Sequence, residues 1–198
     1  EYTKVGPGLD FTTGFEIIAN DDELFVDKSS NIDTPIPKDE DEWNEFKSTF
    51  RVDYDRFSKG DGKKVHHKDV EKEIPITVSA MANKEGGTLF VGVDDDGNLL
   101  GLENDYDLLK NPNDDKFQRI VWQTIQKYIG NKPYVSKLNI SLIEKNLKKI
   151  CIITIPRADE PIAVHDNNTQ ETYVRIGPKS EKFAPLEFMK YCKKRFDD

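Results

Sequence analysis

The sequence predicts an α+β domain with a mixed, mostly antiparallel sheet and about three packed helices. Short β-branched and aromatic runs are separated by turn signals, which is typical of hairpin-connected strands. Three longer stretches instead repeat apolar residues with helical spacing. A length of 198 residues suits one domain with an appended arm, so we expect an arm at residues 1–38 and the domain at residues 39–198.

The chain is predicted to begin with an N-terminal arm, followed by a strand with one charged face. Two short apolar pieces around Asn20 predict a hairpin or, alternatively, an extension that packs on another body. A polar, proline-containing linker follows. Residues 43–52 alternate apolar and polar side chains, which predicts a strand whose charged face holds Glu45, Lys47 and Arg51.

A central stretch, residues 70–102, is predicted to form a helix, a glycine turn, a strand, an acidic hairpin turn and a second strand. The apolar residues of its helix share one face. Asp69 is the expected N-cap, and Pro75 is expected to start or kink the helix. Asp96 and Gly97 form the strongest hairpin signal in the sequence, directly after the buried strand at residues 88–93.

The remaining elements follow from their caps and turns. An amphipathic helix is predicted between a cap at Asn113 or Asp114 and its end at Gly130. Two strands are expected at residues 134–143 and 149–155, and a hairpin at residues 161–165 and 171–176. Pro185 is predicted to open a final helix that ends at Phe196.

Composition limits the classes of function. The net charge of −8 argues against strong, nonspecific nucleic-acid binding, but a basic segment at residues 47–68 can still bind phosphates. The apolar runs are too short to span a bilayer, and no secretory signal pattern opens the chain. Cys151 and Cys192 are too few for a disulfide framework, so we expect reduced thiols in a cytoplasmic protein with no membrane partner.

Three blocks of sequence resemble the Schlafen AlbA-like domain. They are EFKSTFR at residues 45–51, the stretch TVSAMANKEGGTLFVGVDDDGNLLGLENDYDLL at residues 77–109, and YVRIGPKS at residues 173–180. The resemblance covers about residues 40–196. It implies an α+β module that binds nucleic acid. Some relatives are labelled as ATP-binding, but ATP is not expected here because the chain has no P-loop motif.

The resemblance also implies a catalytic site, because related domains in animal Schlafen proteins are metal-dependent endoribonucleases on tRNA and rRNA. Their trio of acids corresponds to Glu40, Glu45 and Asp94 here, with Asp95 competing for the third place. Such carboxylates suit Mg²⁺ or Mn²⁺, which polarises a phosphate and activates water. Lys47 is expected to offset charge on the phosphorus centre. Alternatively, these residues form only a solvated strand face and a turn.

Nucleic-acid contacts are expected from basic residues beside the polar loop and the glycine turn, with ordinary surface charge as the alternative. These residues are Arg51, Lys63, Lys64, Arg175, Lys179 and Lys182. The resemblance favours an endoribonuclease acting on structured RNA such as tRNA, with RNA rather than DNA as partner. Because animal Schlafens use two such domains, a homodimer or a parent protein would supply the second. A non-catalytic binding or regulatory module and a protein-interaction scaffold are the alternatives.

Overall fold

The computed structural model describes residues 35–60, 64–167 and 169–196, and in the arm only residues 18–20 and 23–25. The chain divides into two compact units, Glu1–Pro35 and Ile36–Asp198. In the first unit, strands β1 (Ile18–Asn20) and β2 (Glu23–Phe25) pair antiparallel. A hairpin around Asn20 is one of the two sequence predictions for this segment, and its turn at residues 21–22 lies outside the described residues.

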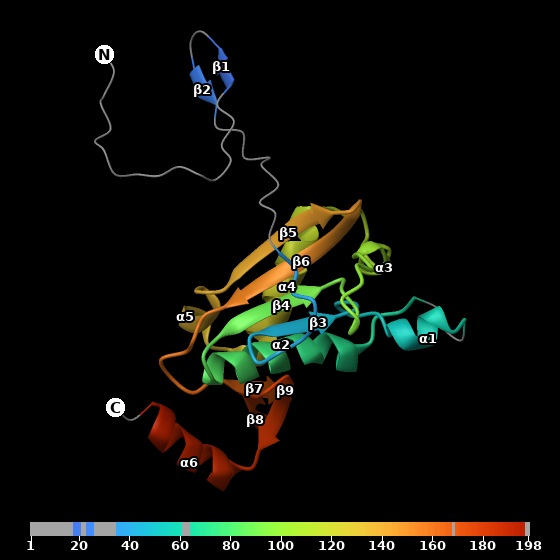
Figure 1. Cartoon of the computed structure of the whole chain (residues 1–198). Helices are drawn as coiled ribbons and strands as arrows, with labels where there is room; N and C mark the ends of the chain where they lie inside the picture. The colour runs from blue at the N-terminus through green and yellow to red at the C-terminus, as the bar shows by residue number, and fades with distance from the viewer. Residues whose placement is uncertain (1–17, 21–22, 26–34, 61–63, 168, 197–198) are drawn as a thin grey trace, which may run out of the picture. The chain divides into compact units, whose positions relative to one another are not determined.

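The larger unit is built on a four-stranded sheet with the order β3-β4-β6-β5 (Figure 1). The strands are β3 (Asn44–Lys47), β4 (Gly87–Val91), β5 (Asn139–Lys145) and β6 (Lys148–Ile155). Only β3 and β4 are parallel, and the other neighbours are antiparallel. The predicted mixed, mostly antiparallel α+β fold is therefore confirmed, and β3 lies at an edge of its sheet.

One face of this sheet packs on two long helices, α2 (Lys68–Asn83) and α4 (Asp114–Ile129). Helix α4 begins at the Asn113 N-cap and ends at the left-handed Gly130, as predicted. Helix α2 differs from the prediction, because its N-cap is His67 rather than Asp69. Pro75 is buried inside α2 and does not begin it, so packing on the sheet outweighs the lost backbone hydrogen bond.

The opposite face of the sheet holds a smaller apolar cluster. Phe46, Phe90, Ile150 and Ile152 are buried there, and Ile36 packs against them. The approach of the chain to β3 crosses the acidic turn, because a Cβ on Gly97 would lie 2.9 Å from the carbonyl oxygen of Lys38. The turn after β4 therefore packs against the segment that leads into β3.

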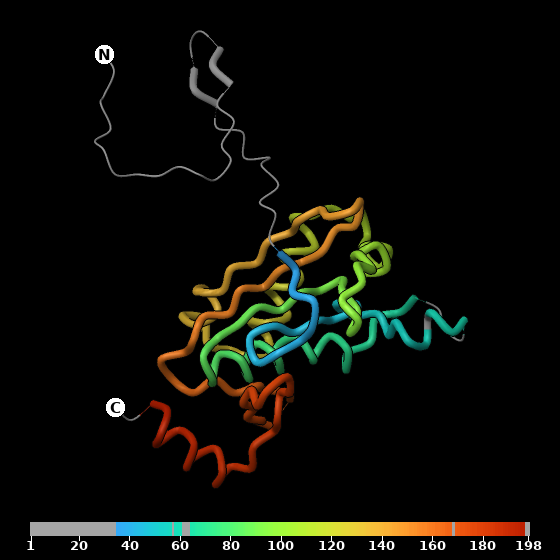
Figure 2. Tube along the Cα trace, viewed as in Figure 1, coloured from blue at the N-terminus to red at the C-terminus, as the bar shows by residue number. Residues whose placement is uncertain are grey.

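A second, three-stranded antiparallel sheet lies on the other side of α2 (Figure 2). It comprises β7 (Ala163–Asp166), β8 (Thr169–Ile176) and β9 (Lys179–Phe183). Its inner face packs on α2 and α4 through Val164 and Tyr173. Helix α6 (Pro185–Arg195) follows and begins at Pro185, as predicted.

Several short elements differ from the sequence predictions. The strand predicted to reach Val52 ends at Lys47, because the amides of Phe50 and Arg51 donate to the Asp105 carboxylate instead of to a strand. The expected start of the strand at residue 134 is a short helix, α5 (Lys132–Val135). Strand β9 was not predicted, and α1 (Tyr54–Ser58) and α3 (Glu103–Tyr106) complete the helices.

Neither cysteine is in a disulfide, and Cys151 is buried in the core, where burial raises the pKa of its thiol. No helix in the described part of the chain is long and apolar enough to cross a bilayer.

Candidate functional site

The edge strand β3 carries a buried ion pair with the second sheet. The Oε2 atom of Glu45 lies 2.5 Å from Nη1 of Arg175 on β8. The Oε1 atom of Glu45 lies 2.7 Å from Nζ of Lys47. Glu45 is 7% exposed and Arg175 is 1% exposed, so both carboxylate oxygens are bound to cations away from solvent. The EFK and YVRIGPKS blocks therefore meet in space and hold the two sheets together.

Arg175 also closes the start of the edge strand. Its Nη2 atom donates to the carbonyl oxygens of Asp41 at 2.7 Å and Asn44 at 3.2 Å. The carboxylate of Glu40 accepts the amide of Phe46 at 2.7 Å. Unpaired edge-strand amides and carbonyls invite pairing with another chain, so these side chains protect the edge of β3.

Glu40 lies in an acidic environment. Burial raises the pKa of its carboxyl group, and the negative charges of Glu45 and Asp95 raise it further, while the bond from the Phe46 amide opposes this change. The neighbour of Glu40 from the acidic turn is therefore Asp95. The sequence had placed Asp94 first and Asp95 as its competitor.

Asp94 shapes the acidic turn. Its Oδ1 atom accepts the amides of Asp96 at 3.1 Å and Asn98 at 2.7 Å, and its Oδ2 atom accepts the Asn98 side-chain amide at 3.1 Å. The backbone also closes the turn, because the Gly97 amide donates to the Asp94 carbonyl oxygen. These bonds are those of an aspartate that stabilises a turn through its own backbone.

The trio Glu40, Glu45 and Asp94 does not fit a metal ion in this conformation. Across residues 35–60, 64–167 and 169–196, no three His, Cys, Asp or Glu side chains form a group that could hold one. Glu45 is neutralised by Arg175 and Lys47, and Asp94 is occupied by its turn. An Mg²⁺ or Mn²⁺ site at the trio would need Glu45 to leave its ion pairs.

The predicted nucleic-acid contacts occupy very different environments. Arg175 lies in the interior rather than at the surface. Arg51 is half-buried over the Phe50 ring, and burial lowers its pKa. Lys64 is paired with Asp107, and Lys182 is paired with Glu171.

The two other predicted contacts are Lys179 and Lys63. Lys179 is exposed on β9. Lys63 lies outside the described residues.

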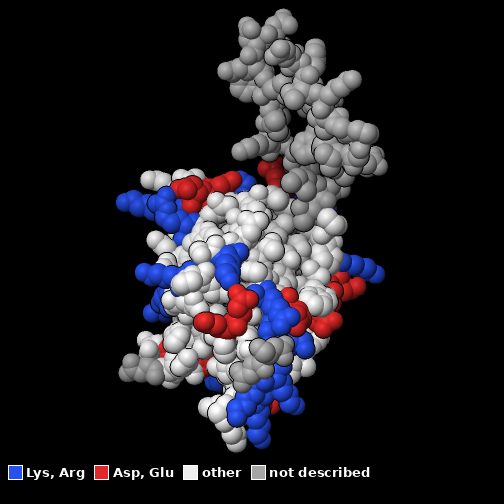
Figure 3. Space-filling model, turned by 90° about the vertical axis from the view of Figure 1, so that its left-hand side faces the viewer, with Lys and Arg blue, Asp and Glu red and all other residues white. Residues whose placement is uncertain are grey.

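The sequence reasoning missed a group of lysines on α6. Lys190, Lys193 and Lys194 are exposed, and within the described part of the chain no acidic side chain pairs with them. Figure 3 shows basic side chains gathered at the lower end of the larger unit, the end at which Figure 1 places α6. A helical wheel of residues 185–196 would have placed Phe188 and Tyr191 inside and left these lysines outside.

Comparison with known proteins identifies the larger unit. The family model described as Schlafen, AlbA_2 matches residues 40–184. The chain belongs to this family. Membership associates the Schlafen AlbA_2 domain with nucleic acids. No curated protein shows significant sequence similarity to the chain.

Two solved structures resemble the Schlafen AlbA_2 domain at low identity. The DIP2311 protein from Corynebacterium diphtheriae is 18% identical with a TM-score of 0.50, over 89% of this chain and 30% of that protein. The N-terminal domain of a RecG-related protein from Nitrosomonas europaea is 22% identical with a TM-score of 0.42, over 71% of this chain and 82% of that one. The first supports the fold alone, and this chain spans less than a third of its length.

Proposed function

We propose that this Schlafen AlbA_2 domain is a binding module for nucleic acid that contacts phosphates through α6. The observation that carries the proposal is the set of exposed lysines on α6, namely Lys190, Lys193 and Lys194, which no described acidic side chain neutralises. Some lysines elsewhere on the surface are paired, as in Lys137 with Asp159 and Lys149 with Asp114, whereas others, such as Lys110 and Lys132, are exposed singly. Helix α6 therefore differs from these positions in presenting three such lysines within one element.

The acidic total charge does not oppose local binding. At physiological ionic strength, charges more than roughly 8 Å apart are largely screened, so a phosphate at α6 responds chiefly to that helix. Each lysine that neutralises a phosphate releases counterions and steepens the dependence of affinity on salt. The proposal thus predicts moderate, salt-sensitive binding with few phosphate contacts.

Fluorescence anisotropy with labelled tRNA, measured from 50 to 200 mM salt, tests this proposal. The double variant Lys193→Gln with Lys194→Gln is expected to weaken binding and to reduce the salt slope by about two units. The matched control changes Lys110 and Lys132, two exposed lysines elsewhere, by the same amount of charge. Equal losses in both double variants, or flat binding across salt, would contradict a specific role for α6.

Metal-dependent RNA cleavage by Glu40, Glu45 and Asp94 is a second proposal. The family resemblance motivates it, and the approach of Glu45 to Glu40 supports it, but the acid of the turn that nears Glu40 is Asp95 rather than Asp94. The pairing of Glu45 with Arg175 weighs against it, which is why we place binding first. A homodimer would bring two such clusters together, and RNA rather than DNA is the expected substrate.

Incubation of tRNA with the protein and Mn²⁺ tests cleavage directly. Glu45→Gln and Asp94→Asn are expected to abolish any cleavage that these carboxylates perform, and circular dichroism must show that each variant is still folded under the assay conditions. Cleavage that persists in both variants would come from a contaminating nuclease. Binding without cleavage by the unaltered protein would leave the non-catalytic module as the function.

A further inference from the structure

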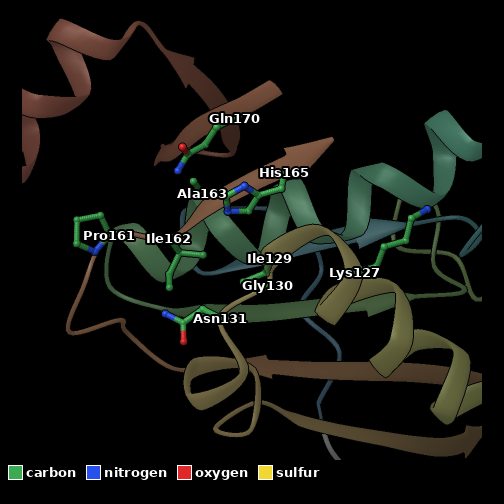
Figure 4. Close-up of a pocket in the computed structure, with 9 residues that line it drawn as sticks. All are labelled: Lys127, Ile129, Gly130, Asn131, Pro161, Ile162, Ala163, His165 and Gln170. Atoms are coloured by element: carbon green, nitrogen blue, oxygen red, sulfur yellow. The ribbon is translucent and has the colours of Figure 1, made fainter. Parts of the chain in front are cut away.

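Two hollows adjoin on the outer face of the small sheet. The larger has a volume of about 740 Å³ and lies between that face and the start of α6. The smaller has a volume of about 440 Å³ and extends to the end of α4 (Figure 4). Pro161, Ala163 and Gln170 line both hollows, so we treat them as one surface, the outer groove. Each volume lies within the range of small-molecule sites, roughly 300–1,000 Å³.

The register of the sheet explains the floor of the outer groove. Ala163 pairs with Thr172, which in turn pairs with Phe183, so these three side chains share one face. Val164 and Tyr173 alternate with them and point inward to α2. A small residue at position 163 therefore leaves space in the middle of the groove, where the two hollows meet.

Aromatic side chains form one wall of the outer groove. Phe183 and Phe188 both line the larger hollow. Tyr191 packs behind them, with ring centroids 5.7 Å from Phe183 and 6.2 Å from Phe188. Such packing fixes the two phenyl rings in place, which favours a flat, apolar ligand at low cost in side-chain entropy.

The rim of the outer groove supplies polar groups. The exposed amide of Gln170 makes no hydrogen bond within the described residues, so it can both donate and accept. Figure 4 shows Gln170 and His165, from the two strands of one hairpin, on the same rim of the smaller hollow. An amide and an imidazole beside an aromatic wall suit a planar heterocycle with mixed donors and acceptors.

The one carboxylate that lines the larger hollow is already neutralised. Glu171 accepts Lys182 at 2.5 Å, the Tyr173 hydroxyl at 2.7 Å and Lys72 at 3.3 Å. These bonds hold the pKa of Glu171 at about 2, with Lys182 making the largest contribution. Its charge therefore does not repel a phosphate that approaches from α6.

The lysines of α6 belong to the helix that forms one side of the outer groove. Pro185 and Phe188 of α6 line the groove, and the exposed lysines follow on the same helix. A helix of 11 residues spans about 16 Å, which is the length of a few nucleotides. A strand that crosses α6 from its lysine face toward Phe188 would place a base at the groove.

We propose that the outer groove accepts an unstacked nucleobase, so that the nucleic acid bound by this domain is single-stranded. This inference rests on the proposed binding of nucleic acid by α6. A duplex keeps its bases paired and stacked, and would offer phosphates to α6 but nothing to the aromatic wall. A single strand satisfies both surfaces at once.

Anisotropy with a fluorescein-labelled RNA of 12 nucleotides, compared with its duplex, tests the proposal. The single strand is expected to bind about tenfold more tightly, since stacking one base on an aromatic side chain contributes at this scale. Ala163→Phe fills the middle of the groove and is expected to remove that advantage while duplex binding stays unchanged. Gln170→Ala, at an exposed site, is expected to weaken single-strand binding several-fold. This variant tests the groove if Ala163→Phe does not fold.

The control variant is Thr154→Phe, which places the same ring on an exposed strand position of the other sheet. It is expected to leave both affinities unchanged. Equal affinity for the single strand and the duplex, with no effect of Ala163→Phe or Gln170→Ala, would overturn the proposal that the groove accepts a base. It would leave the proposed binding at α6 intact. Binding that ignores the Lys193→Gln and Lys194→Gln changes, or no binding of either RNA, would overturn the proposed function and the groove with it.

Discussion

Arg175 and Glu45 are 130 positions apart in sequence, and their side chains meet at 2.5 Å in the interior. The pair joins β8 of the small sheet to the edge strand of the large one. Arg175 has no exposed side-chain area, so its charge depends on Glu45 and on two backbone carbonyl oxygens for compensation. Through this contact, the sequence blocks at residues 45–51 and 173–180 together connect the two sheets.

Breaking the Glu45–Arg175 ion pair is predicted to destabilise the domain strongly. Glu45→Gln leaves a buried guanidinium without its counter-charge and is expected to cost about 3–5 kcal/mol in the free energy of unfolding. Urea denaturation of Glu45→Gln, Arg175→Met and the double variant measures the coupling. The double variant should lose less than the sum of the single losses, because neither charge is then left alone.

Lys47→Met is the control for that cycle. Lys47 also contacts Glu45, but its side chain is 23% exposed. Its removal is expected to cost about 1 kcal/mol or less. Strict additivity between the Glu45 and Arg175 variants would show that the two side chains stabilise the fold independently.

Asp105 is predicted to make stability depend on pH near neutrality. Burial raises its pKa to about 6, against the bonds from the Phe50 and Arg51 amides. The pKa of Asp105 is higher in the folded state than in the unfolded state. Its contribution to the stability of the fold is therefore fully present below about pH 4 and is lost as pH rises through 6. Between pH 7 and pH 4, the free energy of unfolding of the native protein is expected to rise by about 2–3 kcal/mol more than that of Asp105→Asn.

Thermal unfolding of both proteins across that range provides the measurement. The variant is expected to be less stable overall, since an amide oxygen replaces a carboxylate that accepts two backbone amides. The diagnostic quantity is therefore the difference in slope rather than the offset. Parallel pH profiles would show that Asp105 ionises normally.

Glu171 is predicted to have the opposite effect in acid. Its pKa of about 2 lies below the ordinary value, chiefly through the bonds from Lys182 and Tyr173. Its contribution is present above about pH 4.5 and is lost as pH falls toward 2. Since its side chain is 20% exposed, we expect a loss of about 1–2 kcal/mol, which Glu171→Gln should abolish in the same acid titration.

The sequence predicted those elements whose signals are local. The Asn113 cap, the Gly130 end of α4 and the Pro185 start of α6 depend on neighbouring residues only, and all three are confirmed. The end of β3 could not be predicted, because it depends on Asp105, more than 50 positions away, accepting the amides of Phe50 and Arg51. A local alternation pattern carries no information about such a distant acceptor.

The candidate site was likewise only partly predictable from the sequence. Glu45, Lys47 and Arg175 were selected for their charge, and they do meet. That the charges neutralise one another in the interior follows from how two sheets pack around α2, which spacing along the chain does not encode. The α6 lysines were missed because a basic helix is ordinary in a sequence, and their grouping on an exposed face follows from how α6 packs.

Gly97 is predicted to be required for more than its backbone conformation. Its φ of +79° disfavours any side chain, and an added Cβ would also lie 2.9 Å from the carbonyl oxygen of Lys38. Gly60 has a similar φ of +76° but no atom of the described residues within 4 Å of such a Cβ, so Gly60→Ala measures the conformational strain alone. We expect about 1 kcal/mol for Gly60→Ala and at least about 2 kcal/mol for Gly97→Ala in urea denaturation. The difference would measure how firmly the segment before β3, and with it Glu40, is held over the acidic turn, and equal losses would show that the segment moves aside freely.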